Sequence, residues 1–72
     1  MNRAKLLGIM KENNDTQDSL ASAIGLSRTR LSAKIHERDG AMFNQAEMAA
    51  IKKRYNLDDI TFSAIFFDDN VA

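Results

Sequence analysis

The sequence predicts an all-α domain of five short helices, and three observations support this class. Apolar residues recur every three or four positions in successive segments, which is the spacing of one face of a helix. A residue that can cap a helix stands directly before four of these segments. Proline is absent from all 72 residues, so nothing interrupts the helical patterns. We therefore expect one compact domain over residues 1–67 and an acidic, frayed tail at residues 68–72.

The first two helices are expected at residues 3–13 and 17–24. The apolar residues of the first form a single stripe among basic and acidic residues, as in a helix with one buried face. Polar residues 13–15 then end this pattern. Thr16 is suited to cap the second helix, because its hydroxyl can accept a backbone N–H bond from the first turn.

A tight turn is expected after the second helix. Gly25 can take the left-handed conformation that ends a helix, and Ser27 can cap a third helix that runs from Arg28 to about His36. A polar loop with a turn glycine follows. Two helices joined by such a turn are typical of a DNA-reading helix-turn-helix. The apolar residues that fix their spacing are Leu20, Ile24, Leu31 and Ile35.

The last two helices begin at Asn44 and Asp58. Asn44 with Glu47 three residues later resembles a capping box, and Asp58 can cap the fifth helix. The fourth helix carries its buried face on Met48, Ile51 and Tyr55. The fifth is too apolar for a free surface helix, so part of it must be covered. Its apolar residues are Ile60, Phe62, Ile65, Phe66 and Phe67.

The formal net charge is zero, but the charge is unevenly distributed along the chain. Residues 1–55 hold all ten basic residues against six acidic ones, which gives +4. Residues 56–72 hold four aspartates and no base, which gives −4. Because the local field rather than the total charge attracts a polyanion, the basic first part remains compatible with nucleic-acid binding.

Enzyme, metal and membrane functions find little support in the sequence. There is no cysteine, no glycine-rich phosphate loop and a single histidine, His36, without an obvious partner for general-base chemistry. We therefore expect no catalytic residue, no metal site and no cofactor. The apolar runs are too short to cross a membrane, and the acidic end would be repelled by an anionic one. A soluble cytoplasmic protein is expected.

One arc of the third helix is suited to reading bases. At 100° per residue, Arg28, Thr29, Ser32 and Ala33 fall within about 140° on a face away from Leu31. Their side chains are short apart from one arginine, so the helix could enter a major groove about 12 Å wide. Arginine can bond guanine, the hydroxyls can bond base edges, and alanine can pack on a thymine methyl.

A second set of residues is expected to contact DNA phosphates. Arg30 and Lys34 lie one turn apart on the flank of the third helix, where cations meet phosphates rather than bases. The starts of the second and fourth helices offer free N–H groups beside polar side chains. The remaining candidates are Thr16, Gln17, Arg38 and Asn44.

The chain resembles the Cro and repressor helix-turn-helix family of temperate phages. The resemblance lies in Gln17-Asp18-Ser19-Leu20-Ala21, in Gly25-Leu26-Ser27 and in residues 31–36 with the later Phe43, and it covers residues 3–67. It implies a compact, lambda-repressor-like domain that regulates transcription in a bacterial host cell by binding an operator in double-stranded DNA. It assigns phosphate contact to Gln17, Lys34 and Asn44, and base reading to Arg28, Thr29 and Ser32 or Ala33.

Partner proteins remain a second hypothesis. So few basic residues predict weak binding by a monomer, so a homodimer on paired half-sites is expected. Some small phage proteins of this fold act instead by binding the phage's own repressor. The acidic second half would suit such an anti-repressor, with Phe62, Phe66 and Phe67 as the partner surface.

Overall fold

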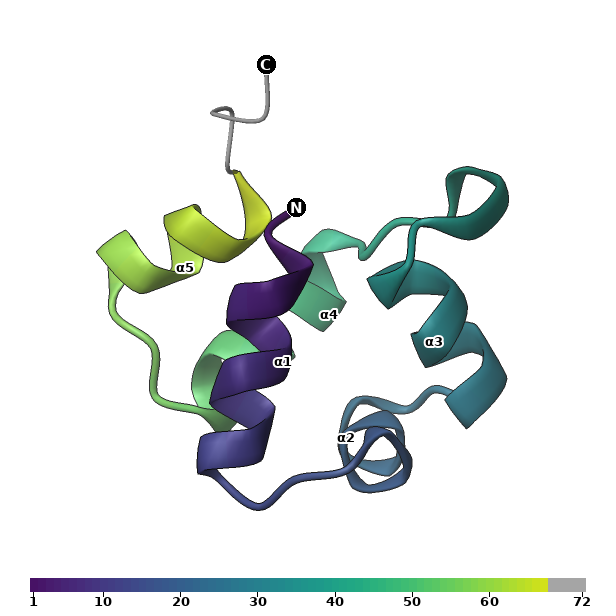
Figure 1. The fold of residues 1–72 in the computed structure, drawn as a ribbon, viewed down its shortest axis with the longest axis horizontal. Coiled ribbons are helices and arrows are strands. Elements are labelled where there is room, and N and C mark those ends of the chain that lie inside the picture. Colours follow the sequence, from purple (N-terminus) through teal and green to yellow (C-terminus); the bar gives the residue numbers. More distant parts are fainter. Residues whose placement is uncertain (68–72) are drawn as a thin grey trace.

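The computed structural model describes residues 1–67, which form five α-helices and contain no strand (Figure 1). The predicted all-helical class and all five predicted helices are confirmed, whereas the predicted tail at residues 68–72 lies outside the described part. A single 3₁₀ turn, Arg38–Gly40, occupies the expected polar loop. The helices are α1 (Arg3–Glu12), α2 (Gln17–Ile24), α3 (Arg28–Ile35), α4 (Gln45–Arg54) and α5 (Asp59–Phe66).

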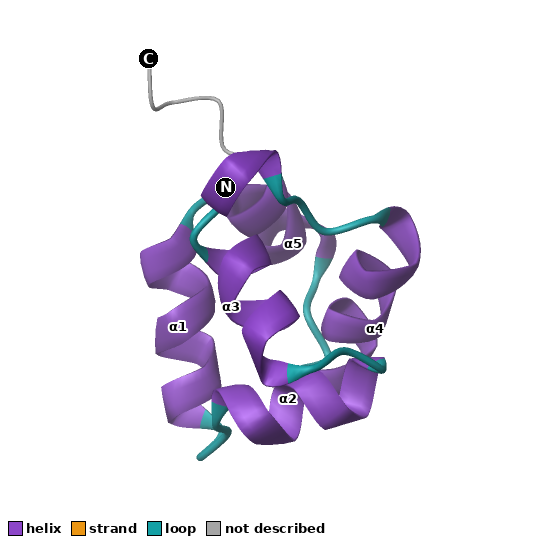
Figure 2. Ribbon diagram, turned by 90° about the vertical axis from the view of Figure 1, so that its right-hand side faces the viewer, coloured by secondary structure: helices purple, strands orange, loops and turns teal. Residues whose placement is uncertain are grey.

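The helices enclose one core to which each of them contributes. Figure 2 looks onto α3, with α2 below it and α1 and α4 on its two sides. α2 packs against both α3 and α4, while α5 packs against α1. Close packing of these side chains is the main stabilisation that so short a chain can obtain. The fully buried residues are Leu6, Leu20, Leu31, Ile35, Ile51 and Ile65.

Side-chain caps start the helices, as the sequence predicts. Thr16 accepts a bond from the Ser19 N–H at 3.1 Å, and Ser27 accepts one from the Arg30 N–H at 3.2 Å. Each such cap contributes about 1 kcal/mol. The predicted caps Asn44 and Asp58 also hold, and Asn44 forms the expected capping box with Glu47. One cap was not predicted, since Asn2 accepts from the Lys5 N–H at the start of α1.

The turn between α2 and α3 adopts the predicted conformation. Gly25 has φ 78° and ψ 28°, which lies in the left-handed region that favours glycine. The Leu26 N–H returns to the Ala21 carbonyl at 2.8 Å and closes the end of α2. Ala21 is only 3% exposed, so its small side chain lies inside the packed core close to this turn.

Two further features bear on the edges of the fold. The Asn2 N–H donates to the Ile65 carbonyl at 2.7 Å, which joins the segment before α1 to α5. Among residues 1–67, every helix is too short or too polar to span a bilayer.

Candidate nucleic-acid interface

α3 divides into a buried face and an exposed polar start. Leu31 and Ile35 have no exposed surface, because they point into the core between the other helices. Arg28 and Thr29 are exposed, whereas Ser32 and Ala33, one turn later, are half-buried. The structure therefore leaves the first turn of the predicted base-reading arc most accessible.

Arg28 lies beside the first turn of α2. Its Nη1 is 3.8 Å from Asp18 Oδ2, and both side chains remain about two-thirds exposed at 67% and 70%. An exposed ion pair of this length contributes little to stability, typically about 0–1 kcal/mol. Arg28 can therefore exchange Asp18 for another acceptor at low cost. The contact also shows that α2 and α3 begin next to each other.

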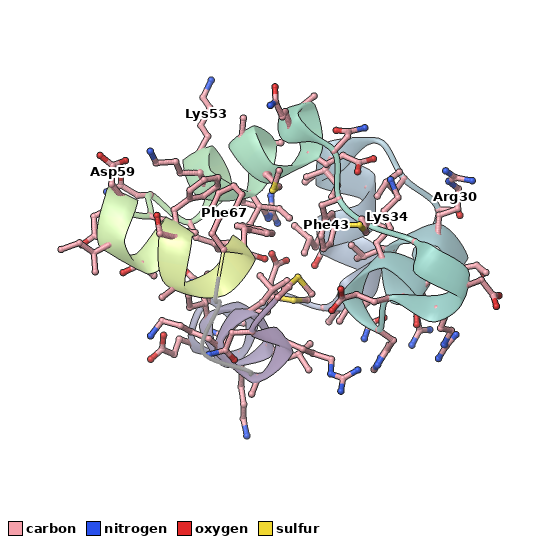
Figure 3. The ribbon with its side chains drawn as sticks, turned by 90° about the horizontal axis from the view of Figure 1, so that it is seen from above. Arg30, Lys34, Phe43, Lys53, Asp59 and Phe67 are labelled. Carbon is pink, nitrogen blue, oxygen red and sulfur yellow. The ribbon has the colours of Figure 1, made fainter. Side chains whose placement is uncertain are left out.

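The predicted exposed position of Lys34 is wrong. It was expected on an exposed flank with Arg30, but it is only 8% exposed, and its Nζ lies 2.6 and 2.8 Å from the two carboxylate oxygens of Glu47. Lys34 lies beside Ile35 and three residues after Leu31, so it belongs to the edge of the buried face. Figure 3 shows Arg30 pointing outward while Lys34 lies inside.

Glu47 connects this pair to the start of α4. Its Oε1 also accepts from the Asn44 N–H at 3.0 Å, while Asn44 Oδ1 accepts from the Glu47 N–H at 2.8 Å. Burial raises the pKa of Glu47, but bonds from Lys34 and the Asn44 backbone outweigh it and lower the pKa overall. The carboxylate therefore stays charged. The Asn44 side chain, a predicted phosphate ligand, is already engaged as a cap.

The other predicted phosphate ligands lie at the start of α2 and in the 3₁₀ turn. Thr16 and Ser19 form a reciprocal capping box, in which the Thr16 N–H donates to Ser19 Oγ at 2.9 Å. The Thr16 hydroxyl is thus part of the cap, although the residue is exposed. Gln17 is half-buried at the first position of α2, and Arg38 is exposed.

Asp15 is an important residue that the sequence interpretation missed. Its carboxylate accepts from Arg54 Nε at 2.7 Å and Nη2 at 3.0 Å, and also from the hydroxyls of Ser19 and Tyr55. The hydrogen-bonded Arg54 guanidinium, above all, holds the pKa of Asp15 well below its usual range. Burial and the neighbouring Asp15 raise the pKa of the Tyr55 phenol. These contacts fasten the start of α2 to the end of α4.

The expected partner surface on α5 is smaller than predicted. Phe62 and Phe66 are half-buried, with ring centroids 5.1 Å apart and ring planes tilted by 51°, and Lys52 Nζ lies 5.2 Å from the Phe62 centroid. They are covered because α5 folds back over the core. Phe67, directly after α5, is 57% exposed, and Ile60 on α5 is 83% exposed. The exposed apolar surface of α5 therefore centres on these two residues.

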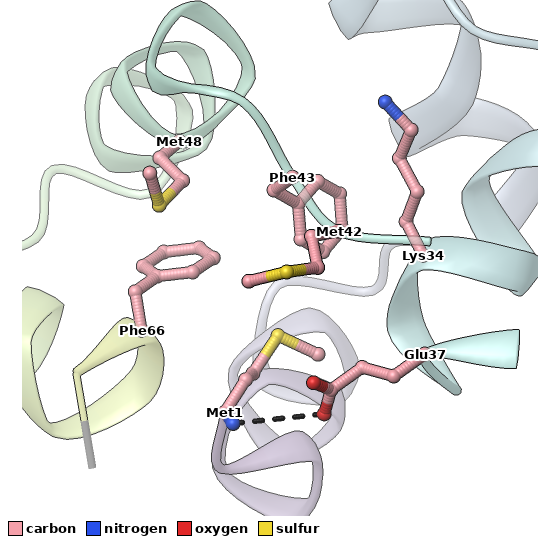
Figure 4. A pocket seen from close by; sticks show the side chains of 7 residues that line it. All are labelled: Met1, Lys34, Glu37, Met42, Phe43, Met48 and Phe66. Carbon is pink, nitrogen blue, oxygen red and sulfur yellow. Dashed lines mark ion pairs between the residues drawn. The ribbon is translucent and has the colours of Figure 1, made fainter. Parts of the chain in front are cut away.

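A small cavity lies between the ends of α3 and α5, the first half of α4, the segment after α3, and Met1 (Figure 4). Its volume is about 60 Å³, well below the roughly 300 Å³ that drug-sized ligands need. Within residues 1–67, the structure also brings no three His, Asp or Glu side chains together as a metal site would require. The cavity is lined by Met1, Lys34, Glu37, Met42, Phe43, Met48 and Phe66.

The single histidine is also placed by the structure. His36 ends α3, and its Nδ1 accepts from Arg3 Nη1 at 2.9 Å. It therefore tethers the end of α3 to the start of α1.

Comparison of the chain with protein-family models, curated proteins and solved structures gives no match. Its function must be inferred from its own residues and geometry.

Proposed function

We propose that this protein is a sequence-specific transcriptional regulator of the phage Cro type, acting in the bacterial cytoplasm. In this proposal α2 and α3 form a helix-turn-helix within a lambda-repressor-like domain, and α3 enters the major groove of operator DNA. The observation that carries the proposal is the character of α3. Its outer face has short polar side chains and an exposed arginine, and the fold makes little use of them.

The neighbours of α3 support this placement. The Arg28–Asp18 contact brings the first turn of α2 to the beginning of α3, and the Lys34–Glu47 pair brings the first turn of α4 to its end. Helix starts present backbone N–H groups that bind phosphates. Gln17 is therefore a candidate phosphate ligand on one side of α3. On the other side, the candidate at the start of α4 is the backbone rather than the Asn44 side chain.

Few exposed cations are available on this part of the molecule. Arg28, Arg30 and Arg38 are exposed, whereas Asp18 adds a negative charge beside Arg28. Each phosphate that a protein neutralises contributes to affinity through counterion release. Binding by one copy is therefore expected to be weak, and a symmetric dimer would provide two half-sites about one helical turn apart.

The test is selection from a random pool of DNA duplexes at low and near-physiological salt. We expect enrichment of a short palindrome that persists at the higher salt, because base contacts are less salt-dependent than phosphate contacts. Arg28→Ala should relax the preference at one base position and cost about 1–3 kcal/mol there. Lys53→Ala is the matched control, since Lys53 is an exposed cation near the end of α4. Absence of any enriched sequence would contradict the proposal.

The exposed apolar surface of α5 favours one alternative, an anti-repressor that binds the phage repressor protein. Ile60 is exposed beside the acidic residues Asp58 and Asp59, and Phe67 is exposed at the other end of α5, which suits a partner with an apolar and basic surface. Co-purification with the repressor should then survive Arg28→Ala and be lost in Phe67→Ser. If the repressor does not co-purify with the unaltered protein, this alternative is excluded.

A further inference from the structure

The Lys34–Glu47 pair differs from the exposed ion pairs of this protein in its burial. Both side chains are only 10% exposed, whereas the Arg28–Asp18 pair is mostly exposed to water. Buried charges are costly unless they are paired and hydrogen-bonded, so the two groups are strongly constrained to meet. Among residues 1–67, no buried polar side-chain atom lacks a partner.

The pair joins α3 and α4 through one carboxylate. Glu47 Oε1 accepts from both the Lys34 ammonium and the Asn44 N–H, and Oε2 accepts a second bond from Lys34. The same carboxylate therefore sets the first turn of α4 and holds the second half of α3. An acceptor fixed by a capping box allows the ammonium little freedom to move.

The surroundings of Lys34 favour a role inside the protein. Its aliphatic stem lies beside the cavity next to Phe43, and its ammonium points away from the cavity (Figure 4). Arg30, one turn earlier, is exposed and contributes a favourable charge to Glu47 from outside. Of these two cations on α3, Arg30 is thus the one available to a phosphate.

We propose that the Lys34–Glu47 ion pair is a positioning device, which fixes the rotation of α3 about its own axis and thereby determines which bases Arg28 and Ser32 reach. This inference rests on the proposed DNA-binding function. A rotation of about 20° moves a side-chain tip about 8 Å from the helix axis by roughly 3 Å, close to the rise of about 3.4 Å per base pair. A small loss of rotational constraint would therefore blur the sequence preference.

The salt dependence of binding separates positioning from phosphate contact. For the selected duplex and one with altered bases, the affinity of Lys34→Met is measured over a range of salt concentrations. If the pair positions α3, Lys34→Met should leave the slope of log K against log salt unchanged. Its preference, the ratio of its affinities for the selected and the altered duplex, should fall roughly tenfold or more. The matched control Arg30→Ala should lower the slope by about 0.9 and keep the preference. The inference is overturned if Lys34→Met behaves as the control does.

Glu47→Gln is a second test, because the two explanations predict opposite changes in DNA binding. Removing a negative charge would strengthen binding to DNA if only long-range electrostatics mattered. Positioning predicts a weaker preference instead, because the amide cannot hold the Lys34 ammonium in the same way. Lys34→Arg keeps the charge and should retain more of the preference than Lys34→Met. A preference that stays unchanged in Glu47→Gln would contradict the inference.

Amide hydrogen exchange tests the inference without DNA. In folded Lys34→Met or Glu47→Gln, the Asn44 N–H and the amides in the second half of α3 should exchange faster, whereas Arg30→Ala should leave them unchanged. Unchanged exchange in both variants would overturn the positioning role. If the unaltered protein selects no duplex sequence, the proposed function fails, and the exchange result still decides whether this pair fixes α3.

Discussion

Helices α3 and α5 have the same length of eight residues but differ in the polar contacts that place them. α3 buries Leu31 and Ile35, and it is also placed by the Ser27 cap, the left-handed Gly25 before it, and the buried Lys34–Glu47 pair. α5 has the Asp58 cap and an exposed ion pair to Lys52, and it is otherwise placed by apolar contacts. Of its residues only Ile65 is buried completely.

The difference shows which surface each helix leaves available. α3 uses two apolar residues, Leu31 and Ile35, for the core and keeps a polar outer face that the fold does not need. α5 has more apolar residues than the core accepts, so Ile60 and Phe67 face the solvent. A polar, partly cationic face suits a polyanion, and an apolar face suits a protein.

The largest expected effect concerns the apolar attachment of α5. Ile65→Ala should lower the free energy of unfolding by about 2–5 kcal/mol, because it removes a fully buried side chain and leaves a cavity. Ile60→Ala, on the exposed face of the same helix, should change it by less than about 0.5 kcal/mol. Urea denaturation of both variants measures the difference. Similar losses in the two variants would contradict the burial pattern of α5.

The second prediction concerns the hydrogen bonds of Asp15 that fasten the start of α2 to the end of α4. Asp15→Asn should destabilise the protein by about 2 kcal/mol, because charge-assisted bonds to Arg54 are lost. Asp18→Asn is the control, since Asp18 is 70% exposed and should hardly affect stability.

Acid titration sharpens this second prediction. The pKa of Asp15 is lowered in the fold from its ordinary value of 3.8, so its stabilisation is fully present above about pH 4. It is lost as the pH falls below that value toward the lowered pKa of the folded state. The fall in stability between about pH 4 and pH 2 should therefore be shallower in Asp15→Asn than in the unaltered protein. An identical pH dependence would count against the role of Asp15.

Replacement of two glycines by alanine should change the free energy of unfolding in opposite directions. An added Cβ would meet no atom within 4 Å at Gly25 or Gly8, so only the backbone conformation matters. Gly25→Ala should destabilise by about 1–2 kcal/mol because φ is 78°. Gly8→Ala, within α1, should stabilise by about 0.5–1 kcal/mol. Thermal unfolding of both variants tests this, and a stabilising Gly25→Ala would contradict the geometry of the turn.

The smallest expected effect tests the outer face of α3. Asp18→Asn frees Arg28 and removes a negative charge beside it, so affinity for duplex DNA should rise by about 0.2–1 kcal/mol. Titration of the selected duplex at low salt measures the change, with Asp59→Asn on α5 as the control. Weaker binding by Asp18→Asn would show that this face does not lie against DNA.

Local features of the fold could be predicted from the sequence, whereas long-range pairs could not. Caps such as Thr16 and Asn44 and the conformation of Gly25 depend on residues three or four positions away, which a helical pattern contains. The partners of Lys34 and Asp15 are 13 and 39 residues distant, and no periodicity indicates them. A helical projection predicted Lys34 on an exposed flank with Arg30, because it could not show that α4 brings a carboxylate to that side of α3.

The candidate site was predicted unevenly for the same reason. The polar arc of α3 follows from its own sequence, and the exposure of Arg28 and Thr29 agrees with it. Their contacts with bases stay a prediction. The engagement of Asn44 by its own cap, and the coverage of Phe62 and Phe66, depend on how other segments fold over them.

The bond between the Asn2 N–H and the Ile65 carbonyl has a consequence for the order of folding. It joins the two ends of the described chain at 2.7 Å, so it closes the longest loop in this part of the molecule. Closing a long loop costs more conformational entropy than forming the adjacent α2–α3 pair. We therefore expect the contact between α1 and α5 to form last during folding and to break first during unfolding, while α3 stays packed against α2.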